Sequence, residues 1–385
     1  MKPAMTVRPK TSDLVPTLYL AFELSHKTWK LGFTTGFGQN PREKNSAARD
    51  LQALDVAIRE ARRRFELSDA APVVSCYEAG RDGFWLHRHV TACGIENIVV
   101  DPSSMEVGRR ARKAKTDRID VRKLLKGLIR YHLGDGRVWS VVSVPNREDE
   151  DSRHLHRELQ QLKGERTRAI NRIKSLLATQ GVCLDKRGKP ELDVDAIRLA
   201  DGTRPLPGLR RRLERELDRM RFLDTQIKQL EQERREQVLM AATPAAQKAR
   251  ALMAFRGIGI NTAWIYGQEF FGWRAFRNGK QVGALAGLTP TPSQSGDSAR
   301  EQGISKSGNR LVRTTSIESA WCWLRFQPES ALSQWYQKRF GHGGSRIRRI
   351  GIVALARKLL VALWRYLETG EIPAGAVLEV APYVR

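Results

Sequence analysis

The spacing of apolar residues in the middle of the chain is the feature that most constrains its architecture. From Asp149 to Gln180, and again after Pro205 and Pro207, apolar residues recur at near-heptad intervals in a charged background. This period places them along one face of a helix. We therefore predict a pair of long amphipathic helices, a helical hairpin or coiled coil, over residues 148–240. The spacing leaves open whether the pair is a structural element, a spacer arm, an RNA support or a dimerisation element.

Before this pair, short apolar strands alternate with helical patterns. Residues 17–33 predict two strands joined by a turn at Ser25–Lys27, and "APVVSCYEAG" and "IENIVVDP" predict two more. Helical patterns cover residues 46–65 and 116–130, and a further helix carries "FWL". This alternation is typical of an α/β domain, here over residues 17–140. Residues 1–16 lack the apolar core of a signal peptide and are expected to form a flexible tail.

After the helical pair, the composition shifts toward Gly, Trp and Arg. We predict a mainly α-helical domain over residues 248–370, followed by a tail at 371–385. The domain opens with "FRGIGINTAW", where Gly257 and Gly259 precede an apolar helix. Such a turn can present backbone N–H groups to a DNA phosphate, as in helix-hairpin-helix modules, although it is also an ordinary connection between helices.

The charge balance indicates a polyanionic partner. The 385 residues include 67 Lys and Arg against 42 Asp and Glu, a formal net charge of +25. Each phosphate neutralised by such a chain releases condensed counterions, which favours nucleic acid. No apolar run reaches the roughly 18 residues of a membrane helix, so no membrane partner is expected.

Cysteine and histidine usage argues against a zinc site. The four cysteines lie far apart with no CxxC pair, which fits a reducing cytoplasm and argues against a disulfide framework. His154 and His156 flank one residue in a polar helical stretch. We expect them to be solvated and not metal-bound.

Carboxylates mark the ends of two expected strands and the start of one expected helix. Glu23 lies on the first strand, Glu78 ends "VVSCYE", and Asp117 and Asp120 are three positions apart and share a helix face. Converging carboxylates repel unless cations lie between them, and Mg²⁺ prefers oxygen ligands. Taken alone, an acid at a strand end is usually solvated, and such an aspartate pair on a helix is usually a polar face or a complement to the helix dipole. Together they match the layout of an RNase H-like nuclease domain.

Basic residues surround the aspartate pair. We expect them to grip a nucleic-acid backbone, with a solvated basic face as the alternative. These residues are Arg109, Arg110, Arg112, Lys113 and Lys115.

"KTDRIDVRKLL" and "YEAGRDGFWLHR" together resemble a family of insertion-sequence transposases, the bridge-RNA-guided recombinases. These combine an N-terminal acidic-tetrad, RNase H-like (RuvC-like) domain with a C-terminal transposase domain. The blocks "FRGIGINTA", "FRNGKQVGALAGLTPTPSQSG", "GISKSGNRLVR" and "VALARKLLVALW" resemble family blocks in the same order. The resemblance covers residues 17–140 and 250–368.

The resemblance implies roles for particular residues. It implies a tetrad of Glu23, Glu78, Asp117 and Asp120 that holds Mg²⁺ or Mn²⁺, although Glu23 stands where the family usually has aspartate. It implies a nucleophilic serine at Ser295 in "SQSG", with Ser293 as the alternative and a plain turn as the simplest explanation. Cations nearby are expected to steady transition-state charge and the flanking strand, namely Arg300, Lys306, Arg310 and Arg313.

The function implied by the resemblance is DNA recombination. A prokaryotic, cytoplasmic enzyme, nucleoid-associated when acting, would mobilise an insertion sequence through a covalent phosphoserine. A structured guide RNA would select donor and target DNA, and the enzyme would act as a dimer or tetramer. One alternative is a metal-dependent structure-specific nuclease or junction resolvase that hydrolyses with water. Another is a non-catalytic nucleic-acid-binding derivative, which the Glu23 departure favours.

Overall fold

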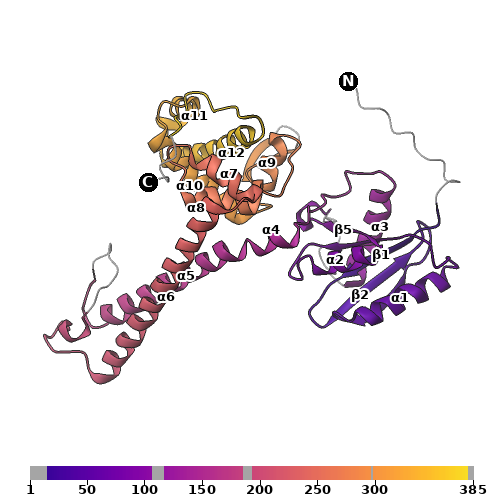
Figure 1. Ribbon diagram of the computed structural model, residues 1–385, viewed down its shortest axis with the longest axis horizontal. Coiled ribbons are helices and arrows are strands. Elements are labelled where there is room, and N and C mark those ends of the chain that lie inside the picture. The colour runs from indigo at the N-terminus through magenta and orange to yellow at the C-terminus, as the bar shows by residue number, and fades with distance from the viewer. Residues whose placement is uncertain (1–14, 106–116, 185–192, 296–297, 380–385) are drawn as a thin grey trace. The chain divides into compact units, whose positions relative to one another are not determined.

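A computed structural model describes residues 15–105, 117–184, 193–295 and 298–379 (Figure 1). The side chains of residues 117–119 and 292–302 lie outside this description. The basic residues Arg109, Arg110, Arg112, Lys113 and Lys115 lie outside it entirely. The chain divides into two compact units, Met1–Val144 and Pro145–Arg385, and each is described by itself.

The first unit is built on a five-stranded mixed sheet with the order β3-β2-β1-β4-β5. Strands β1 (Leu18–Glu23), β2 (Thr28–Thr34) and β3 (Arg42–Ala47) form an antiparallel meander. Strand β4 (Val73–Glu78) pairs parallel with β1, and β5 (Glu96–Val100) pairs parallel with β4. The predicted α/β class is therefore confirmed for this unit.

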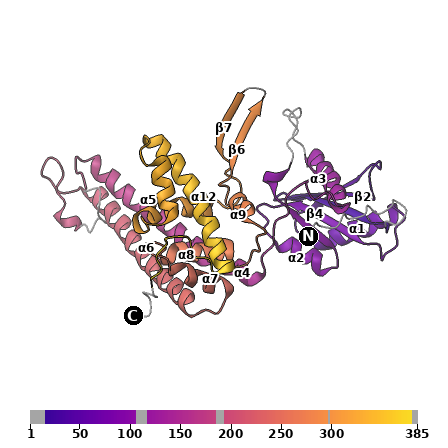
Figure 2. The same ribbon diagram turned by 90° about the horizontal axis from the view of Figure 1, so that it is seen from above.

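Helices cover both faces of this sheet, as Figure 2 shows. Alternate residues of each strand point to opposite faces. Phe22 and Tyr77 pack with α1 (Leu51–Arg64) and α2 (Trp85–Ala92). The opposite face packs against α3 (Asp117–His132).

The predicted helix over residues 46–65 starts too early, because strand β3 and a turn occupy its first residues. Asp50 caps α1 by accepting a hydrogen bond from the Ala53 backbone N–H, and Arg49 has a φ of 68°, which helical residues do not adopt. The strand sequence "REKNSA" is polar and lacks strand-like alternation. Its Glu43 instead accepts a hydrogen bond from Arg122 at 2.7 Å, so tertiary contacts define this edge strand.

The second unit begins with α4 (Arg147–Asp151) and contains the two long helices that the apolar spacing predicts, α5 (His154–Ala178) and α6 (Pro207–Met240). Their outer ends share a core that includes Ile173 and Leu217. Ion pairs link Lys163 to Glu231, Arg166 to Asp224 and Arg172 to Glu216, so the helices run antiparallel.

The remainder of this unit is mainly helical, as predicted, around a core that includes Trp264, Trp323 and Leu355. Its elements are α7 (Pro244–Met253), α8 (Ile260–Tyr266), the π-helical segment η4 (Gly267–Phe271), α9 (Gly279–Leu285), β6 (Pro290–Ser295), β7 (Ser298–Ile304), α10 (Arg310–Phe326), α11 (Ala331–Tyr336), the π-helical segment η5 (Gln337–Gly341) and α12 (Ser345–Thr369). Short 3₁₀ turns lie at Pro102–Ser104 in the first unit and at Val194–Ala196 in the second. Within the described ranges no helix is both long and apolar enough to cross a membrane.

One β-hairpin interrupts this helical unit where we expected only a turn. Strands β6 and β7 pair antiparallel and project from the helices in Figure 2. Two prolines and several polar residues in "PTPSQS" obscure the strand signal.

Candidate active site

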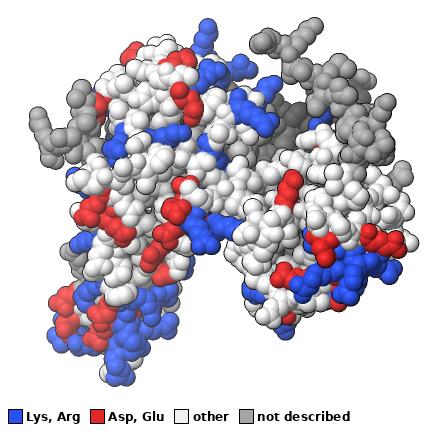
Figure 3. All heavy atoms as spheres, turned by 45° about the vertical axis from the view of Figure 1, so that its right-hand side comes forward, with Lys and Arg blue, Asp and Glu red and all other residues white. Residues whose placement is uncertain are grey.

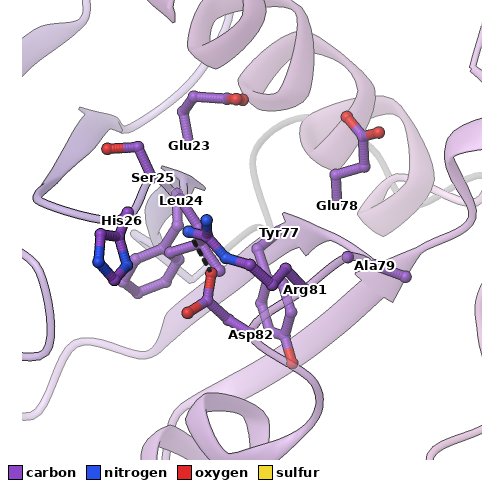
Figure 4. Close-up of a pocket in the computed structure, with 11 residues that line it drawn as sticks. Glu23, Leu24, Ser25, His26, Tyr77, Glu78, Ala79, Arg81 and Asp82 are labelled. Atoms are coloured by element: carbon purple, nitrogen blue, oxygen red, sulfur yellow. Dashed lines mark ion pairs between the residues drawn. The ribbon is translucent and has the colours of Figure 1, made fainter. Parts of the chain in front are cut away.

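Glu23 and Glu78 end two neighbouring parallel strands. Phe22 and Tyr77 are register partners on β1 and β4, so the two glutamates follow at the same edge of the sheet. Because Phe22 and Tyr77 belong to the face covered by α1 and α2, strand alternation directs both glutamates to the α3 face. Figure 4 shows both carboxylates pointing to the same side of the strand ends.

Contacts along α3 define its direction over this face. The Tyr19 hydroxyl lies 2.9 Å from His132 Nδ1 near the end of the helix. Gly32, the register partner of Ala21, packs so closely on the helix that an added Cβ would lie 2.2 Å from Val121 Cγ1. Later residues of β1 therefore meet earlier residues of α3, and the two elements run antiparallel.

This direction brings the start of α3 toward the strand ends that carry Glu23 and Glu78. Asp120 is on the first turn, has a side chain that is 22% exposed, and forms an ion pair with Lys123 at 3.8 Å. Asp117 is the first residue of the helix, and its side chain lies outside the described residues. Among the described side chains, no group of three His, Cys, Asp or Glu could hold a metal ion.

Glu23 and Glu78 line the same pocket, which has a volume of about 420 Å³. Ser25, His26 and Asp82 also line it, and sequence reasoning missed all three. Asp82 is held by ion pairs with Arg49 at 3.0 Å and Arg81 at 3.9 Å, the second of which is drawn in Figure 4. The "YEAGRDG" block, with an acid four residues after Glu78, is the signal that could have indicated Asp82.

The predicted serine lies on the β6–β7 hairpin. Ser295 is the last residue of β6 and pairs with Ser298, while Ser293 pairs with Arg300. The side chains of these residues lie outside the description, so only their backbone register is fixed.

The base of the hairpin is tied to the C-terminal end of α9. The Ser305 N–H donates to the Thr289 carbonyl at 2.9 Å, and the Lys306 N–H donates to the Gly287 carbonyl at 3.2 Å. Arg313 donates to the carbonyl of Ser307 at 3.0 Å, which gives this predicted nucleic-acid contact a structural role. Lys306 and Arg310 are exposed.

A buried carboxylate, Glu269 of η4, connects this loop to the long helices. It accepts hydrogen bonds from His156 at 2.8 Å, Arg157 at 2.9 Å and Asn309 at 3.0 Å. Asn309 in turn caps α10 by accepting from the Leu311 and Val312 N–H groups. Although burial opposes ionisation, the hydrogen bonds from His156 and Arg157 hold the Glu269 pKa at about 2.

This network corrects the expectation for His156. Its side chain is buried and bound to Glu269, and it is not solvated, whereas His154 is exposed as expected. The polar pattern around it gave no indication of a carboxylate 113 positions away.

The "FRGIGINTAW" turn connects α7 to α8. Gly257 has a φ of +92°, in the left-handed region that favours glycine, and Gly259 is the N-cap residue of α8. Neither observation by itself identifies a phosphate contact.

Comparisons with known proteins identify the class of this protein as that of the transposases. The profile of the transposase IS116/IS110/IS902 family matches residues 249–336. A Sinorhizobium fredii protein named as a transposase, y4rJ, is 41% identical over 94% of this chain and 94% of its own length.

The chain therefore belongs to the IS116/IS110/IS902 family of transposases. More distant relatives include the transposase for insertion sequence element IS1328 of Yersinia enterocolitica, 24% identical over 77% of this chain and 84% of its own length. The transposase for insertion sequence element IS1111A of Coxiella burnetii is 25% identical over 74% of this chain and 75% of its own length.

Proposed function

We propose that this transposase cuts and rejoins DNA through a covalent bond between Ser295 and a DNA phosphate, assisted by carboxylates of the first unit. The observation that carries the proposal is the shared pocket of Glu23 and Glu78. Both acids end neighbouring parallel strands on the face where α3 begins. Asp117 is the first residue of α3 and Asp120 lies on its first turn, and we assign both to the proposed tetrad.

The sheet supports an RNase H-like assignment for the first unit. Three antiparallel strands precede two parallel ones in the order β3-β2-β1-β4-β5, with acids at the ends of β1 and β4. An all-carboxylate donor set fits a hard cation such as Mg²⁺ or Mn²⁺. When bound, such a cation neutralises charge on a scissile phosphate. Glu23 carries one methylene more than aspartate, so its carboxylate reaches further from the backbone.

In the proposed step, Ser295 Oγ attacks phosphorus and forms a P–O bond while the bond from phosphorus to one deoxyribose oxygen breaks. The serine proton passes to water, and the released sugar oxygen takes up a proton. The DNA phosphate is then an ester of the protein. A second sugar hydroxyl reverses the step on another strand, which rejoins DNA without an energy source.

The loop after the hairpin supplies cations for this step. Lys306 and Arg310 are exposed near the hairpin base and are free to contact phosphate. Arg300 is the register partner of Ser293 on β7. Arg313 instead holds the loop itself through the Ser307 carbonyl.

A structured RNA guide and an assembly of two or four copies complete the proposal. Support comes from the net charge of +25 and from the antiparallel pair α5–α6. Figure 3 shows basic side chains crowded at the end of this pair, at the lower left, with acids among them. RNA that co-purifies with the protein tests this part: one discrete structured species supports guidance, and only heterogeneous fragments contradict it.

The main alternative is a nuclease that uses the carboxylates and water, and one pair of variants separates the two. On a labelled DNA junction with Mg²⁺, we expect wild type to form a protein–DNA adduct that survives denaturation. Ser295→Ala should form none, whereas Ser293→Ala, two residues away on β6, should retain it. Cutting by Ser295→Ala at the wild-type rate would establish hydrolysis instead.

A further inference from the structure

Residues 330–367 of the second unit include many basic side chains and no acid. Between Ser330 and Leu367 there is no Asp or Glu. The same stretch contains eight basic residues, Lys338, Arg339, Arg346, Arg348, Arg349, Arg357, Lys358 and Arg365. Most of it lies beyond the family match, which ends at residue 336.

Two packed helical segments and a short turn present these charges. The segment α11–η5 ends at Gly341, a turn of His342, Gly343 and Gly344 follows, and α12 begins at Ser345. The Tyr336 hydroxyl donates to the Arg348 carbonyl at 3.3 Å and ties the two segments together. A helix, a three-residue turn that contains glycine and a second helix are the parts of a helix-turn-helix.

The first turns of α12 stand clear of the core. Every residue from Ser345 to Ile350 is exposed, whereas Ile352, Leu355 and Leu359 further along are buried. Arg346, Arg349 and Ile350 have the i, i+3, i+4 spacing of one helix face, on the opposite side from Leu355. Ile350 is 52% exposed, so an apolar group lies beside the two arginines on that face.

The arginines of this segment differ from those of α6. On α6, Arg210, Arg219 and Arg221 form ion pairs with nearby acids. Within the described residues no ion pair involves Arg346, Arg348 or Arg349, nor Lys338 and Arg339 of η5. Their charge is therefore uncompensated and complements a polyanion.

We propose that the first two turns of α12 are a DNA-reading helix that enters the major groove of a duplex, with η5 at the flanking backbone. The major groove, about 12 Å wide, admits an α-helix, and arginine and isoleucine suit guanine edges and thymine methyl groups. The deep, narrow groove of duplex RNA excludes a helix, so DNA is the occupant. The inference rests on the proposed function only in that DNA is the substrate; it is independent of Ser295 and of the tetrad.

Equilibrium binding of the full chain to labelled DNA duplex, RNA duplex and single-stranded DNA tests the inference. The double variant Arg346→Ala/Arg349→Ala should bind duplex DNA at least about tenfold more weakly. The loss should depend on the sequence of the duplex, because the two arginines are proposed to contact base edges. Arg365→Ala removes an exposed arginine from the far end of the same helix and should leave affinity within about twofold of wild type.

The outcomes separate this inference from the proposed function. If the double variant matches Arg365→Ala on duplex DNA, or loses affinity only for RNA, the helix does not read DNA and the inference is overturned. Adduct formation at Ser295 under saturating DNA should persist in the double variant. Loss of that adduct in Ser293→Ala and not in Ser295→Ala would count against the proposed nucleophile and leave the DNA-reading helix untouched. Unchanged thermal unfolding verifies that the exposed substitutions do not disturb the fold.

Discussion

Glu23 and Glu78 share a pocket because both follow a buried aromatic residue at the end of a parallel strand. Alternation then turns both carboxylates away from Phe22 and Tyr77 and toward the α3 face. The sequence alone indicates both acids from their positions after apolar runs. For Asp82 the only local signal is its position four residues after Glu78, and the ion pair with Arg49, 33 positions earlier, is not encoded in that signal.

The requirement for a glutamate side chain at position 23 can be tested by substitution. Glu23→Ala should lower strand exchange at least about a hundredfold, because the proposed metal site would lose one carboxylate. Glu23→Asp introduces the aspartate that is usual at this position in the family, and it should keep activity within about tenfold of wild type. Rates are measured on one DNA junction across a Mg²⁺ titration. Full activity in Glu23→Ala would remove this residue from the site.

Glu269 makes stability depend on pH in the acid range. Its folded pKa of about 2 lies below its usual value of 4.5, because His156 and Arg157 hydrogen-bond to the ionised form. A depressed carboxylate pKa stabilises the fold above the usual value, and this stabilisation, about 3 kcal/mol, is lost as pH falls from 4.5 toward 2.

The measurement is thermal unfolding between pH 5 and 2 for wild type and Glu269→Gln. The variant should be less stable at pH 5 and should show a weaker fall with acid. Parallel curves for the two proteins would mean that the ionised carboxylate contributes nothing to folding.

At the scale of elements, the Glu269–Asn309 hydrogen bond ties η4 to the start of α10 and so to the loop that closes the hairpin. Asn309→Asp should still cap α10 but places a carboxylate against Glu269, which should cost about 1–3 kcal/mol. In the double variant Glu269→Gln/Asn309→Asp, the side-chain amide stands at position 269 and the carboxylate at position 309. Position 269 can then donate the hydrogen bond that position 309 donates in the wild type. The double variant's losses of stability and of adduct yield should be smaller than the sums of the losses in the two single variants.

A double-mutant cycle measured by chemical unfolding and by adduct yield tests this connection. Additive effects of the two substitutions would show that the two side chains act independently. If the two substitutions are coupled in their effect on stability but not in their effect on adduct yield, the Glu269–Asn309 hydrogen bond contributes to folding and does not position the hairpin.

The elements also show what the sequence can predict. Heptad spacing predicts α5 and α6, and apolar runs predict four of the five strands, because a strong period survives in any context. Strand β3 and the hairpin β6–β7 were missed, since both are polar. Contacts distant in sequence stabilise β3, and no local pattern encodes them.

For the whole molecule, the surplus of 67 basic over 42 acidic residues predicts strong salt dependence of nucleic-acid binding. Each phosphate contact contributes about 0.9 to the slope of log affinity against log salt. We expect a slope steeper than about −4 for wild type, measured by fluorescence anisotropy on duplex DNA. A slope near zero would show that the charge serves solubility and not DNA binding.

The central claim, a phosphoserine at Ser295, is tested most directly by mass spectrometry of the trapped protein–DNA adduct. After nuclease and trypsin digestion, cleavage at Lys280 and Arg300 releases the peptide Gln281–Arg300, which contains Ser293, Ser295 and Ser298. The account predicts a nucleotide remnant on this peptide, with fragment ions that assign it to Ser295. A remnant on any other residue, or DNA cutting with no modified peptide, would contradict it.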